Sequence, residues 1–486
     1  MENERGKWGS NLGFLLAAIG SAVGLGNIWG FPYKMGKSGG FTFLIVYLLL
    51  GFFVGFVIMM GELAMGRKTG KGVIGAYYDL SKKFRWVGWL AVFAPFVIMS
   101  FYSVLGGYCI EYMAINLSNL AFPAVAAGTS GGDLFTAMLT NPLGCLMFTL
   151  LFILICFLIN RGGISGGIEK FNNIGMPALF VMLVIIIARS LTLPNAMEGL
   201  KFMFLPGYAV EAGFIESAPN LITVMATAGG QLFFSLSLAM GAMITYGSYL
   251  DKKESLVKNS VIIVISDTTV ALMAGLAVLP AAIANGINSG IPLNEIKLGG
   301  PSLLFVTLQD VFTNMGTVGY LFGVIFYLLV LIAAITSAIS LIEVITTYFL
   351  DRAALKGKQG NRHKVVALVC LAIVVEAAIV AIDGLGSNGL WVPGQQMFGV
   401  SGWNDCWLDF MDCWSEGIAM PLGALLMSLM VAYEIKPKLL LDEIHISGTH
   451  KIDWFFKFCI YITVPLGMIL ILVGQIDAFF VLGIFS

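Results

Sequence analysis

Thirteen residues near the N-terminus combine helix-breaking residue types with atoms that can bind ions. The stretch GSAVGLGNIWGFP, residues 20–32, holds four glycines, an asparagine and a proline inside the first long apolar run. A helix that breaks there exposes carbonyl oxygens, which bind cations, and N–H groups, which bind anions. Inside a membrane such backbone must line a polar cavity. The stretch therefore predicts a site for an ion and a zwitterion, although glycines also form packing seams between helices.

Further polar residues lie inside later apolar runs. The stretch GGQLFFSLSLAMGAMITYGSY, 229–249, is broken in the same way as the first. Thr336 and Ser337 offer two hydroxyls, and Asp267 is the only acid deep in its run. A carboxylate in mid-membrane is expected to have a nearby cation or a proton. The alternatives are hydroxyls that bond carbonyls one turn earlier and a neutral aspartic acid bonded to a helix carbonyl.

The composition places these residues in a membrane. The chain has 486 residues, of which 58% are hydrophobic and 11% charged, and its mean hydropathy is +0.91. A water-soluble protein of this length needs far more polar surface, so we predict an all-α polytopic membrane protein. The net charge of −1 gives no indication of nucleic-acid binding, and no cleavable signal peptide is visible.

Eleven apolar runs are long enough to cross a bilayer as helices. They lie near residues 11–35, 41–65, 87–120, 143–160, 166–189, 217–249, 258–286, 316–350, 364–383, 407–434 and 455–483. The stretch 299–312 is amphipathic and too short to span, so we expect a helix in an external loop.

The basic residues predict the orientation of the spans. With the N-terminus inside, the inside segments hold 22 of the 27 lysines and arginines, and the outside segments hold 5. This asymmetry follows the positive-inside rule. We therefore expect residues 1–10 on the cytoplasmic side of the cell's inner (plasma) membrane and the C-terminus outside.

The two broken stretches occupy corresponding places if the chain has two halves. Spans 1–5 cover residues 11–190 and spans 6–10 cover 217–434, followed by the eleventh span at 455–483. An odd number of spans in each half inverts the second half. Paired interrupted helices in inverted repeats indicate the central site of a secondary transporter. We predict a 5+5 inverted repeat with unwound first and sixth helices.

Four stretches resemble the neurotransmitter:sodium symporter family, whose bacterial members include transporters of leucine, tyrosine and other hydrophobic amino acids. RGKWGSNLGFLLAAIGSAVGLGNIWGFPY is similar to its first helix, and GGFTFLIVYLLLGFFVGFVIMMGELAMGR to its second. GQLFFSLSLAMGAMITYGSY and AAITSAISLIE are similar to the sixth and eighth. The resemblance covers spans 1–10. It implies sodium-coupled symport by alternating access, without enzyme activity or an organic cofactor.

The resemblance implies two sodium sites built from oxygen ligands, which suit a hard cation. One takes the carbonyls of Gly20, Val23 and Ala333 with the hydroxyls of Thr336 and Ser337. The other takes the Ala22 carbonyl, Asn27, Ser235 and a seventh-helix residue, which is Asp267 or, if the alignment shifts by one, Ser266.

Asp267 has a further role in this resemblance. Animal members of the family need chloride beside the first sodium, whereas bacterial members that do without chloride carry an acid in this part of the seventh helix. Asp267 is therefore expected to balance the sodium charge, with Tyr47, Gln231 and Ser235 as neighbours. This implies transport that is independent of chloride.

The family's substrate site also maps onto this sequence. The substrate carboxylate would meet the N–H groups of Leu25 and Gly26 and the hydroxyl of Tyr102, with Tyr108 as the alternative if the register slips. The remaining implied residues are Ala22, Ile98, Phe234, Ser235, Ser237, Met240, Ser337 and Leu341. This pocket carries no charged side chain, so we predict a neutral, hydrophobic L-amino acid. Ala239 and Met240 replace a glycine and an aromatic residue of many members, which leaves the substrate's size open.

Two gates complete the resemblance. The inner gate comprises Arg5 and Trp8, Ser248 and Tyr249, and Asp351, with Arg5 paired to Asp351. At the outer gate the family usually has an arginine where this chain has Gly30, paired with an aspartate that matches Asp412. Lys34 lies four residues on and is expected to replace that arginine. Glu62 matches a second-helix glutamate and is expected to brace the unwound first helix.

Other classes of membrane protein fit the sequence less well. No HExxH or GxSxG motif supports an intramembrane enzyme, and no filter-like loop repeats as a channel would require. A proton-coupled amino-acid carrier of the same inverted-repeat architecture remains the alternative to a sodium symporter.

Overall fold

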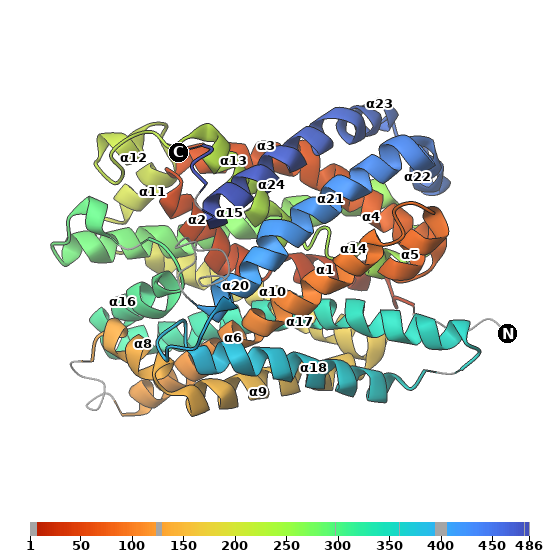
Figure 1. The fold of residues 1–486 in the computed structure, drawn as a ribbon. Helices are drawn as coiled ribbons and strands as arrows, with labels where there is room; N and C mark the ends of the chain where they lie inside the picture. The colour runs from red at the N-terminus through yellow and green to blue at the C-terminus, as the bar shows by residue number, and fades with distance from the viewer. Residues whose placement is uncertain are drawn as a thin grey trace.

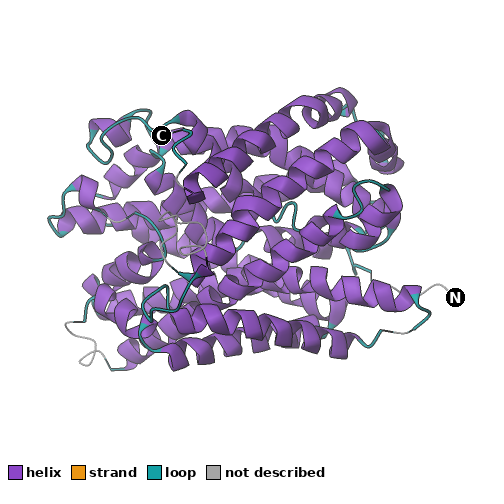
Figure 2. Ribbon diagram, viewed as in Figure 1, coloured by secondary structure: helices purple, strands orange, loops and turns teal. Residues whose placement is uncertain are grey.

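Helices form the framework of the molecule. The computed structural model describes residues 7–122, 129–296, 298–358, 360–393, 406–480 and 482–485, and these residues contain no strand. Figures 1 and 2 show a bundle of long helices that run roughly side by side. The predicted all-α membrane fold is confirmed.

Among the described residues, nine helices are long and apolar enough to cross a membrane. They are Phe41–Thr69, Val87–Ala121, Pro142–Asn160, Ile164–Leu191, Leu256–Asn288, Thr317–Leu355, Arg362–Asp383, Trp407–Ile435 and Asp453–Phe480. A tenth span consists of Asn11–Ala22 and Gly26–Lys37, which are bent by 45° at the break between them. The predicted sixth span is two short helices, Leu221–Ser235 and Ala242–Gly247. The count of eleven therefore stays a prediction.

Several of these spans consist of two or three α-helical pieces separated by short distorted turns. The straight pieces are α1 (Asn11–Ala22), α2 (Phe31–Lys37), α3 (Phe41–Leu50), α4 (Phe56–Thr69), α6 (Val87–Ala121), α9 (Pro142–Asn160), α10 (Lys170–Leu191), α13 (Leu221–Ser235), α14 (Ala242–Gly247), α15 (Leu256–Asn288), α17 (Thr317–Leu355), α18 (Arg362–Asp383), α20 (Trp407–Asp412), α21 (Met420–Leu429), α23 (Asp453–Phe458) and α24 (Val464–Phe480). Wider π-helical turns complete the spans at Gly26–Gly30, Gly51–Gly55, Ile164–Glu169, Cys413–Ala419, Met430–Ile435 and Cys459–Thr463.

Short helices connect the spans at both ends of the bundle. They are α5 (Val73–Leu80), α8 (Gly131–Leu139), α11 (Ala196–Phe204), α12 (Tyr208–Glu211), α16 (Leu308–Asn314) with a preceding turn at Leu303–Thr307, and α22 (Pro437–Ile444), besides short turns at Leu293–Glu295 and His445–Ser447. Of these, the sequence predicted only the helix near 299–312. Figure 1 shows α8, α11, α12 and α16 at one end and α5 and α22 at the other. These are the two sides that the basic residues predict as outside and inside.

Polar side chains start several of the helices. The Ser10 hydroxyl accepts a hydrogen bond from the Gly13 N–H at 2.9 Å and caps α1. Asn141, Ser255 and Asn361 cap α9, α15 and α18 in the same way. Each cap pairs an N–H group that the first turn of a helix leaves without a partner.

The broken spans lie in the interior and the continuous ones surround them. Helix α1 packs against α10, α15 and α17, and α14 packs against α4 and α17. Every residue of α14 is buried, as is every residue of α4 from Phe56 to Arg67. By contrast, α9 and α18 leave large apolar side chains such as Leu154, Leu368 and Leu371 exposed. Such faces are expected to meet lipid, whereas the interior helices are free to carry a polar site.

Candidate functional site

The first broken helix turns its backbone toward α6 and α17. Helix α1 ends at Ala22, and Val23 has extended backbone angles of φ −76° and ψ 100°. Beyond the break, the Leu25 N–H donates to the Tyr102 hydroxyl at 3.1 Å. A Cβ at position 24 would lie 2.3 Å from Ser337 Oγ and 2.6 Å from Tyr102 Oη, so the approach of these helices requires glycine.

The sixth span is broken over residues 236–241. Ser237 and Ala239 adopt positive φ angles of 52° and 60°, which side-chain-bearing residues rarely adopt. Two contacts hold this backbone: the Ala239 N–H donates to Glu62 Oε1 at 2.7 Å, and Ser237 Oγ donates to the Ser21 carbonyl at 2.8 Å. Glu62 was predicted to brace the first broken helix, but its described hydrogen bond goes to the sixth. Both breaks were predicted, and both lie at the centre of the bundle.

Five oxygen-bearing groups meet where α1 breaks beside α17. Thr336 Oγ1 lies 2.9 Å from the Ala333 carbonyl oxygen and 3.4 Å from that of Val23. Ser337 Oγ lies 3.3 Å from the Gly20 carbonyl oxygen. The bond to Ala333 is the ordinary bond to the preceding turn, whereas Ser337 reaches across to another helix. These are the groups predicted for one sodium site, and hydroxyl and carbonyl oxygens suit a hard cation.

A second polar cluster surrounds Asp267 on α15. Its carboxylate is fully buried and accepts from Asn27 Nδ2 at 2.7 Å, from Ser235 Oγ at 2.9 Å and from Tyr47 Oη at 3.4 Å. Ser266, the alternative residue, is only half-buried. Asp267 therefore joins both broken helices, at the place predicted for the other sodium site.

Two residues predicted beside this second cluster make other described contacts. Gln231 was expected beside Asp267, but its amide donates to the Gly26 carbonyl at 2.6 Å. Ala22 lines the cavity described next. Within the described ranges, no group of three or more His, Cys, Asp and Glu could hold a metal ion, so neither cluster resembles a transition-metal centre.

A cavity lies between the two breaks and the third and eighth spans. Its lining consists of Ser21, Ala22, Gly24, Gly26, Ile98, Tyr102, Phe234, Ser237, Met240, Ser337 and Leu341, and includes no charged residue. Of the residues predicted for the substrate, Leu25 and Ser235 are absent from this lining: Leu25 contacts Tyr102, and Ser235 contacts Asp267. Tyr108 packs against Phe305 at 5.8 Å between ring centroids, away from the cavity. The sequence prediction missed Ser21 and Gly24, which lie next to predicted residues.

The predicted inner gate is partly described. The Trp8 indole N–H donates to the Tyr246 carbonyl at 3.2 Å, and its ring lies edge-on to Tyr249 at 6.4 Å. Asp351 Oδ2 accepts from the Gly72 N–H at 2.7 Å, which was not predicted. The Ser248 hydroxyl bonds within its own turn. Arg5 lies outside the described residues, and so does its predicted pairing with Asp351.

The outer gate differs from the prediction in its acidic partner. The Lys34 ammonium pairs with Glu416, and not with Asp412 one helical turn away on the same span. The two paired residues are 8% and 7% exposed. A Cβ at Gly30 would lie 2.5 Å from Gln231 Oε1, so the Gln231 amide occupies the space next to this position. The Lys34 side chain reaches from α2 to the tenth span, a contact between distant segments that sequence spacing does not fix.

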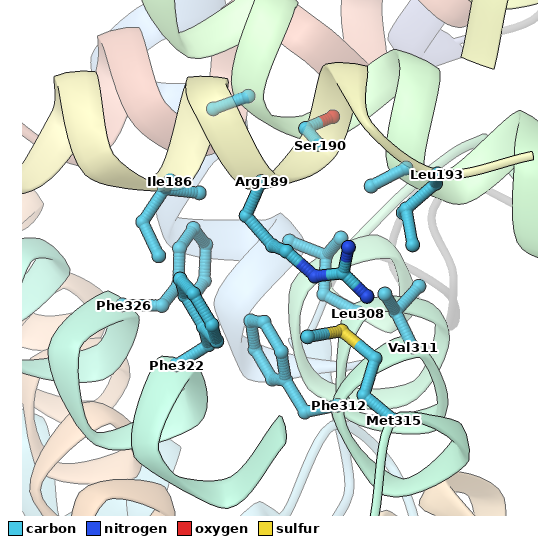
Figure 3. A pocket seen from close by; sticks show the side chains of 12 residues that line it. Ile186, Arg189, Ser190, Leu193, Leu308, Val311, Phe312, Met315, Phe322 and Phe326 are labelled. Atoms are coloured by element: carbon cyan, nitrogen blue, oxygen red, sulfur yellow. The ribbon is translucent and has the colours of Figure 1, made fainter. Parts of the chain in front are cut away.

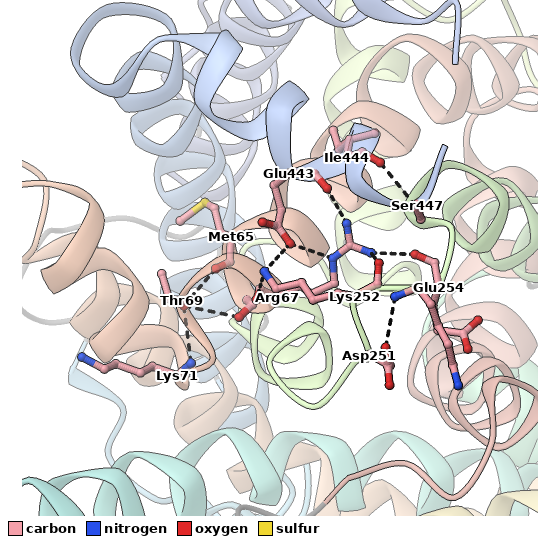
Figure 4. Close-up of polar contacts among 12 residues, drawn as sticks. Met65, Arg67, Thr69, Lys71, Asp251, Lys252, Glu254, Glu443, Ile444 and Ser447 are labelled. Carbon is pink, nitrogen blue, oxygen red and sulfur yellow. Dashed lines mark hydrogen bonds and ion pairs between the residues drawn. The ribbon is translucent and has the colours of Figure 1, made fainter. Parts of the chain in front are cut away.

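An ionic cluster with a buried centre, Arg67 and Glu443, lies at the other end of the bundle and was not predicted as a site. Arg67 Nε donates to Glu443 Oε1 at 2.8 Å, and its Nη1 donates to the Glu254 carbonyl at 2.6 Å (Figure 4). Lys252 Nζ also donates to Glu443 Oε1, at 2.7 Å. Arg67 and Lys252 are among the basic residues that the positive-inside rule predicts on the cytoplasmic side. The cluster ties α4 to α22 and to the loop after α14.

A second such pair joins the eighth and ninth spans. Arg362 pairs with Glu343, which is fully buried and also accepts from the Tyr249 hydroxyl at 3.1 Å. Arg362 Nε donates to the Asn160 carbonyl at 3.0 Å. The predicted gate residue Tyr249 is thus held by a charged pair whose partners lie 19 residues apart in the sequence.

Two interrupted helices, an uncharged cavity between them and oxygen clusters beside it define a secondary transporter of the broken-helix class. The chain belongs to the sodium:neurotransmitter symporter family, whose family model matches residues 5–126 and 135–484. The predicted family is confirmed. The protein is therefore a sodium-dependent, multi-pass membrane transporter of a small molecule, and not an enzyme.

Relatives and a solved structure agree with this assignment. The chain is 34% identical over 475 residues to the uncharacterized sodium-dependent transporter YhdH of Bacillus subtilis, covering 97% of each. It is 30% identical to the uncharacterized sodium-dependent transporter MJ1319 of Methanocaldococcus jannaschii, covering 95% of this chain and 89% of the relative. The crystal structure of MhsT in complex with L-phenylalanine is similar with a TM-score of 0.81 and 31% identity, over 97% of this chain and all of that one.

Proposed function

We propose that the protein imports a neutral, hydrophobic L-amino acid together with sodium, by alternating access and without chloride. The observation that carries this proposal is the uncharged cavity between the two helix breaks, bordered by an oxygen cluster on each side. A zwitterion needs an N–H-rich place for its carboxylate and a carbonyl-rich place for its amine, and broken helices supply both.

The substrate carboxylate would bind the N–H groups of Leu25 and Gly26 and the Tyr102 hydroxyl. The Tyr102 hydroxyl already accepts from Leu25, so tyrosine and backbone converge on one point. The side chain would lie against Ile98, Phe234 and other apolar residues of the cavity. A charged substrate side chain would remain unpaired there, which is costly. The L-phenylalanine bound to the similar MhsT supports this class.

Two sodium ions would bind, one in each oxygen cluster. Gly20, Val23, Ala333, Thr336 and Ser337 would hold one, and Ala22, Asn27, Ser235 and Asp267 the other. Sodium moving down its gradient would supply the driving force for uptake, while these residues would hold the ends of the broken helices around the ions. We propose no organic cofactor.

Asp267 would supply the negative charge that balances the nearby sodium. The hydrogen bonds from Asn27, Ser235 and Tyr47 stabilise the ionised form of its carboxylate. We expect wild-type uptake without chloride. Asp267→Asn should lose uptake in chloride-free buffer, and added chloride should restore part of it. Uptake by Asp267→Asn equal to wild type without chloride would contradict this role.

The chain would be arranged in the cell's inner (plasma) membrane with its N-terminus in the cytoplasm and its C-terminus outside. We also propose that residues 11–190 and 217–434 form the two inverted repeats. The positions of the breaks in the first and sixth spans support this division.

Uptake into proteoliposomes tests the proposal. With sodium outside, radiolabelled leucine, phenylalanine or tryptophan should accumulate, and excess unlabelled lysine or glutamate should compete poorly. A proton-coupled carrier would instead accumulate substrate in sodium-free buffer across an imposed pH gradient. Accumulation driven by that gradient alone would contradict sodium coupling.

A further inference from the structure

A second cavity lies away from the helix breaks. It is enclosed by the end of α10, by α16 and by the start of α17, with α15 behind it (Figure 3). Its lining shares no residue with that of the first cavity. It lies at the end of the bundle where α8, α11 and α12 gather, which the basic residues predict as the external side.

The walls of this cavity are mostly apolar and include three phenylalanines. Phe312 from α16 and Phe322 and Phe326 from α17 face Arg189 across the space, and Met315 lies beside them (Figure 3). Phe312 and Phe326 are buried, while Phe322 and Met315 are half-buried. The lining is chemically suited to apolar groups and offers little to a water-soluble polar molecule, and the half-buried Phe322 and Met315 would have to move aside to admit an acyl chain.

One cation projects into this apolar space. Arg189, in the last turn of α10, is half-buried, and its guanidinium lies among the apolar side chains (Figure 3). Its Nη1 donates to Thr192 Oγ1 at 3.0 Å. Among the described residues it makes no ion pair with a carboxylate. A guanidinium has five N–H donors, so most of its capacity remains for an anion, and phosphate matches its geometry.

Exposed apolar side chains lie on the two helices that line the cavity, and such faces of spanning helices are expected to meet lipid. On α10, Ile185 is 40% exposed, and on α17 Val318 and Leu321 are 61% and 47% exposed. These apolar residues lie within one or two turns of Arg189 and Phe322 on their helices. A ligand that reaches the cavity from this direction comes from the bilayer.

We propose that this cavity binds one anionic phospholipid. Its phosphate would accept hydrogen bonds from the Arg189 guanidinium, and the upper part of one acyl chain would lie against Phe312, Phe322 and Phe326. Basic residues next to apolar grooves between membrane helices bind anionic lipid head groups by this combination of charge and burial. The site is independent of the proposed substrate, because it involves neither broken helix.

Photo-crosslinking tests the proposal on the whole protein in detergent. The probe is a phosphatidylglycerol analogue with a diazirine in its acyl chain, and labelled peptides are identified by mass spectrometry after digestion. We expect labelling in the segment 303–326. Arg189→Gln should lower that labelling about fivefold, which corresponds to the attraction of one basic residue. Lys201→Gln, a cation on α11 paired with Glu198, should leave it unchanged.

Two further measurements distinguish the contribution of the Arg189 charge from that of the cavity's shape. Leu193→Trp narrows the cavity at a half-buried position and keeps the cation, so it should lower labelling as well. A phosphatidylcholine analogue with the same chain should label the segment less than phosphatidylglycerol does. Labelling by both lipids that is equal in wild type and Arg189→Gln would overturn the proposal, and so would labelling confined to peptides outside 303–326.

Discussion

At the scale of single residues, the candidate site brings together oxygen atoms from residues that are far apart in the sequence. Ser337 Oγ contacts the Ser21 carbonyl at 3.0 Å although the two residues lie on different spans. Asp267 receives donors from three other spans. A dry cation site needs such fixed ligands, because a desolvated charge without partners is costly.

The hydroxyls of α17 allow a direct test of sodium binding. We expect Thr336→Val combined with Ser337→Ala to weaken the apparent sodium affinity about tenfold or more, because two ligands worth about 1 kcal/mol or more each are lost. Sodium-dependent uptake and sodium-induced thermal stabilisation measure this. Thr149→Val is the control, since this buried hydroxyl donates to the Cys145 carbonyl one turn earlier on α9. Unchanged sodium affinity in the double variant would rule out this site.

The Lys34–Glu416 pair makes a prediction about stability. Removing one partner of a buried pair leaves an uncompensated charge, which costs about 3–5 kcal/mol. We expect Lys34→Met or Glu416→Gln alone to lower the thermal unfolding midpoint, and the double variant to recover part of the loss. Lys37→Met, at an exposed position of the same helix, serves as the control. If the double variant lowered the unfolding midpoint by the sum of the two single losses, Lys34 and Glu416 would not stabilise each other.

At the scale of elements, the breaks hold unfavourable backbone that neighbouring helices stabilise. The sixth span bends through Ser237, Ala239 and Gly241, all at positive φ. Glu62 from α4 and Ser21 from α1 hold that backbone. Ser21 therefore links the two broken helices to each other, and Glu62 links the sixth span to α4.

The backbone at Ala239 can be tested by substitution. Glycine removes the steric cost of positive φ, about 1–2 kcal/mol, although it also gains freedom in the unfolded chain. We expect Ala239→Gly to keep or raise the thermal unfolding midpoint and Ala239→Val to lower it. Ala377→Gly, in the middle of α18, should lower it because glycine costs about 0.5–1 kcal/mol there. If both glycine variants lowered the midpoint equally, the strain argument would fail.

At the scale of the whole molecule, different short helices and contacts lie at the two ends of the bundle. One end carries α8, α11, α12 and α16, and the other carries α5, α22 and the Arg67–Glu443 cluster (Figures 1 and 4).

Sidedness can be measured with single added cysteines. The seven native cysteines are buried, so they should contribute little background. In intact cells we expect a membrane-impermeant maleimide to label Ile484→Cys near the C-terminus. Lys253→Cys, in the loop after α14, should be labelled only after permeabilisation. Ser217→Cys, in the loop before α13, is the positive control for the outside. The reverse pattern would invert the predicted orientation.

Local sequence was sufficient to predict the helical membrane fold and both helix breaks. Span length depends on apolar runs, and the breaks depend on glycine-rich clusters such as 20–32, which act over one or two turns. The short helices α5, α11 and α22 were missed because they lack a long apolar run. Most of the cavity lining followed from the family resemblance, which carries three-dimensional information that periodicity alone lacks.

Contacts between distant charged residues were decided only by the tertiary structure. Lys34 pairs with Glu416 rather than Asp412, Glu62 holds the sixth span rather than the first, and Arg67 reaches Glu443. Each contact joins residues from different segments of the chain. A shift of one helix by a single turn along its axis would bring other groups together. The sequence determines which groups are available at each depth of the membrane. The packing of the helices determines which of those groups meet, because a buried charge must take the nearest partner that packing brings within hydrogen-bond distance.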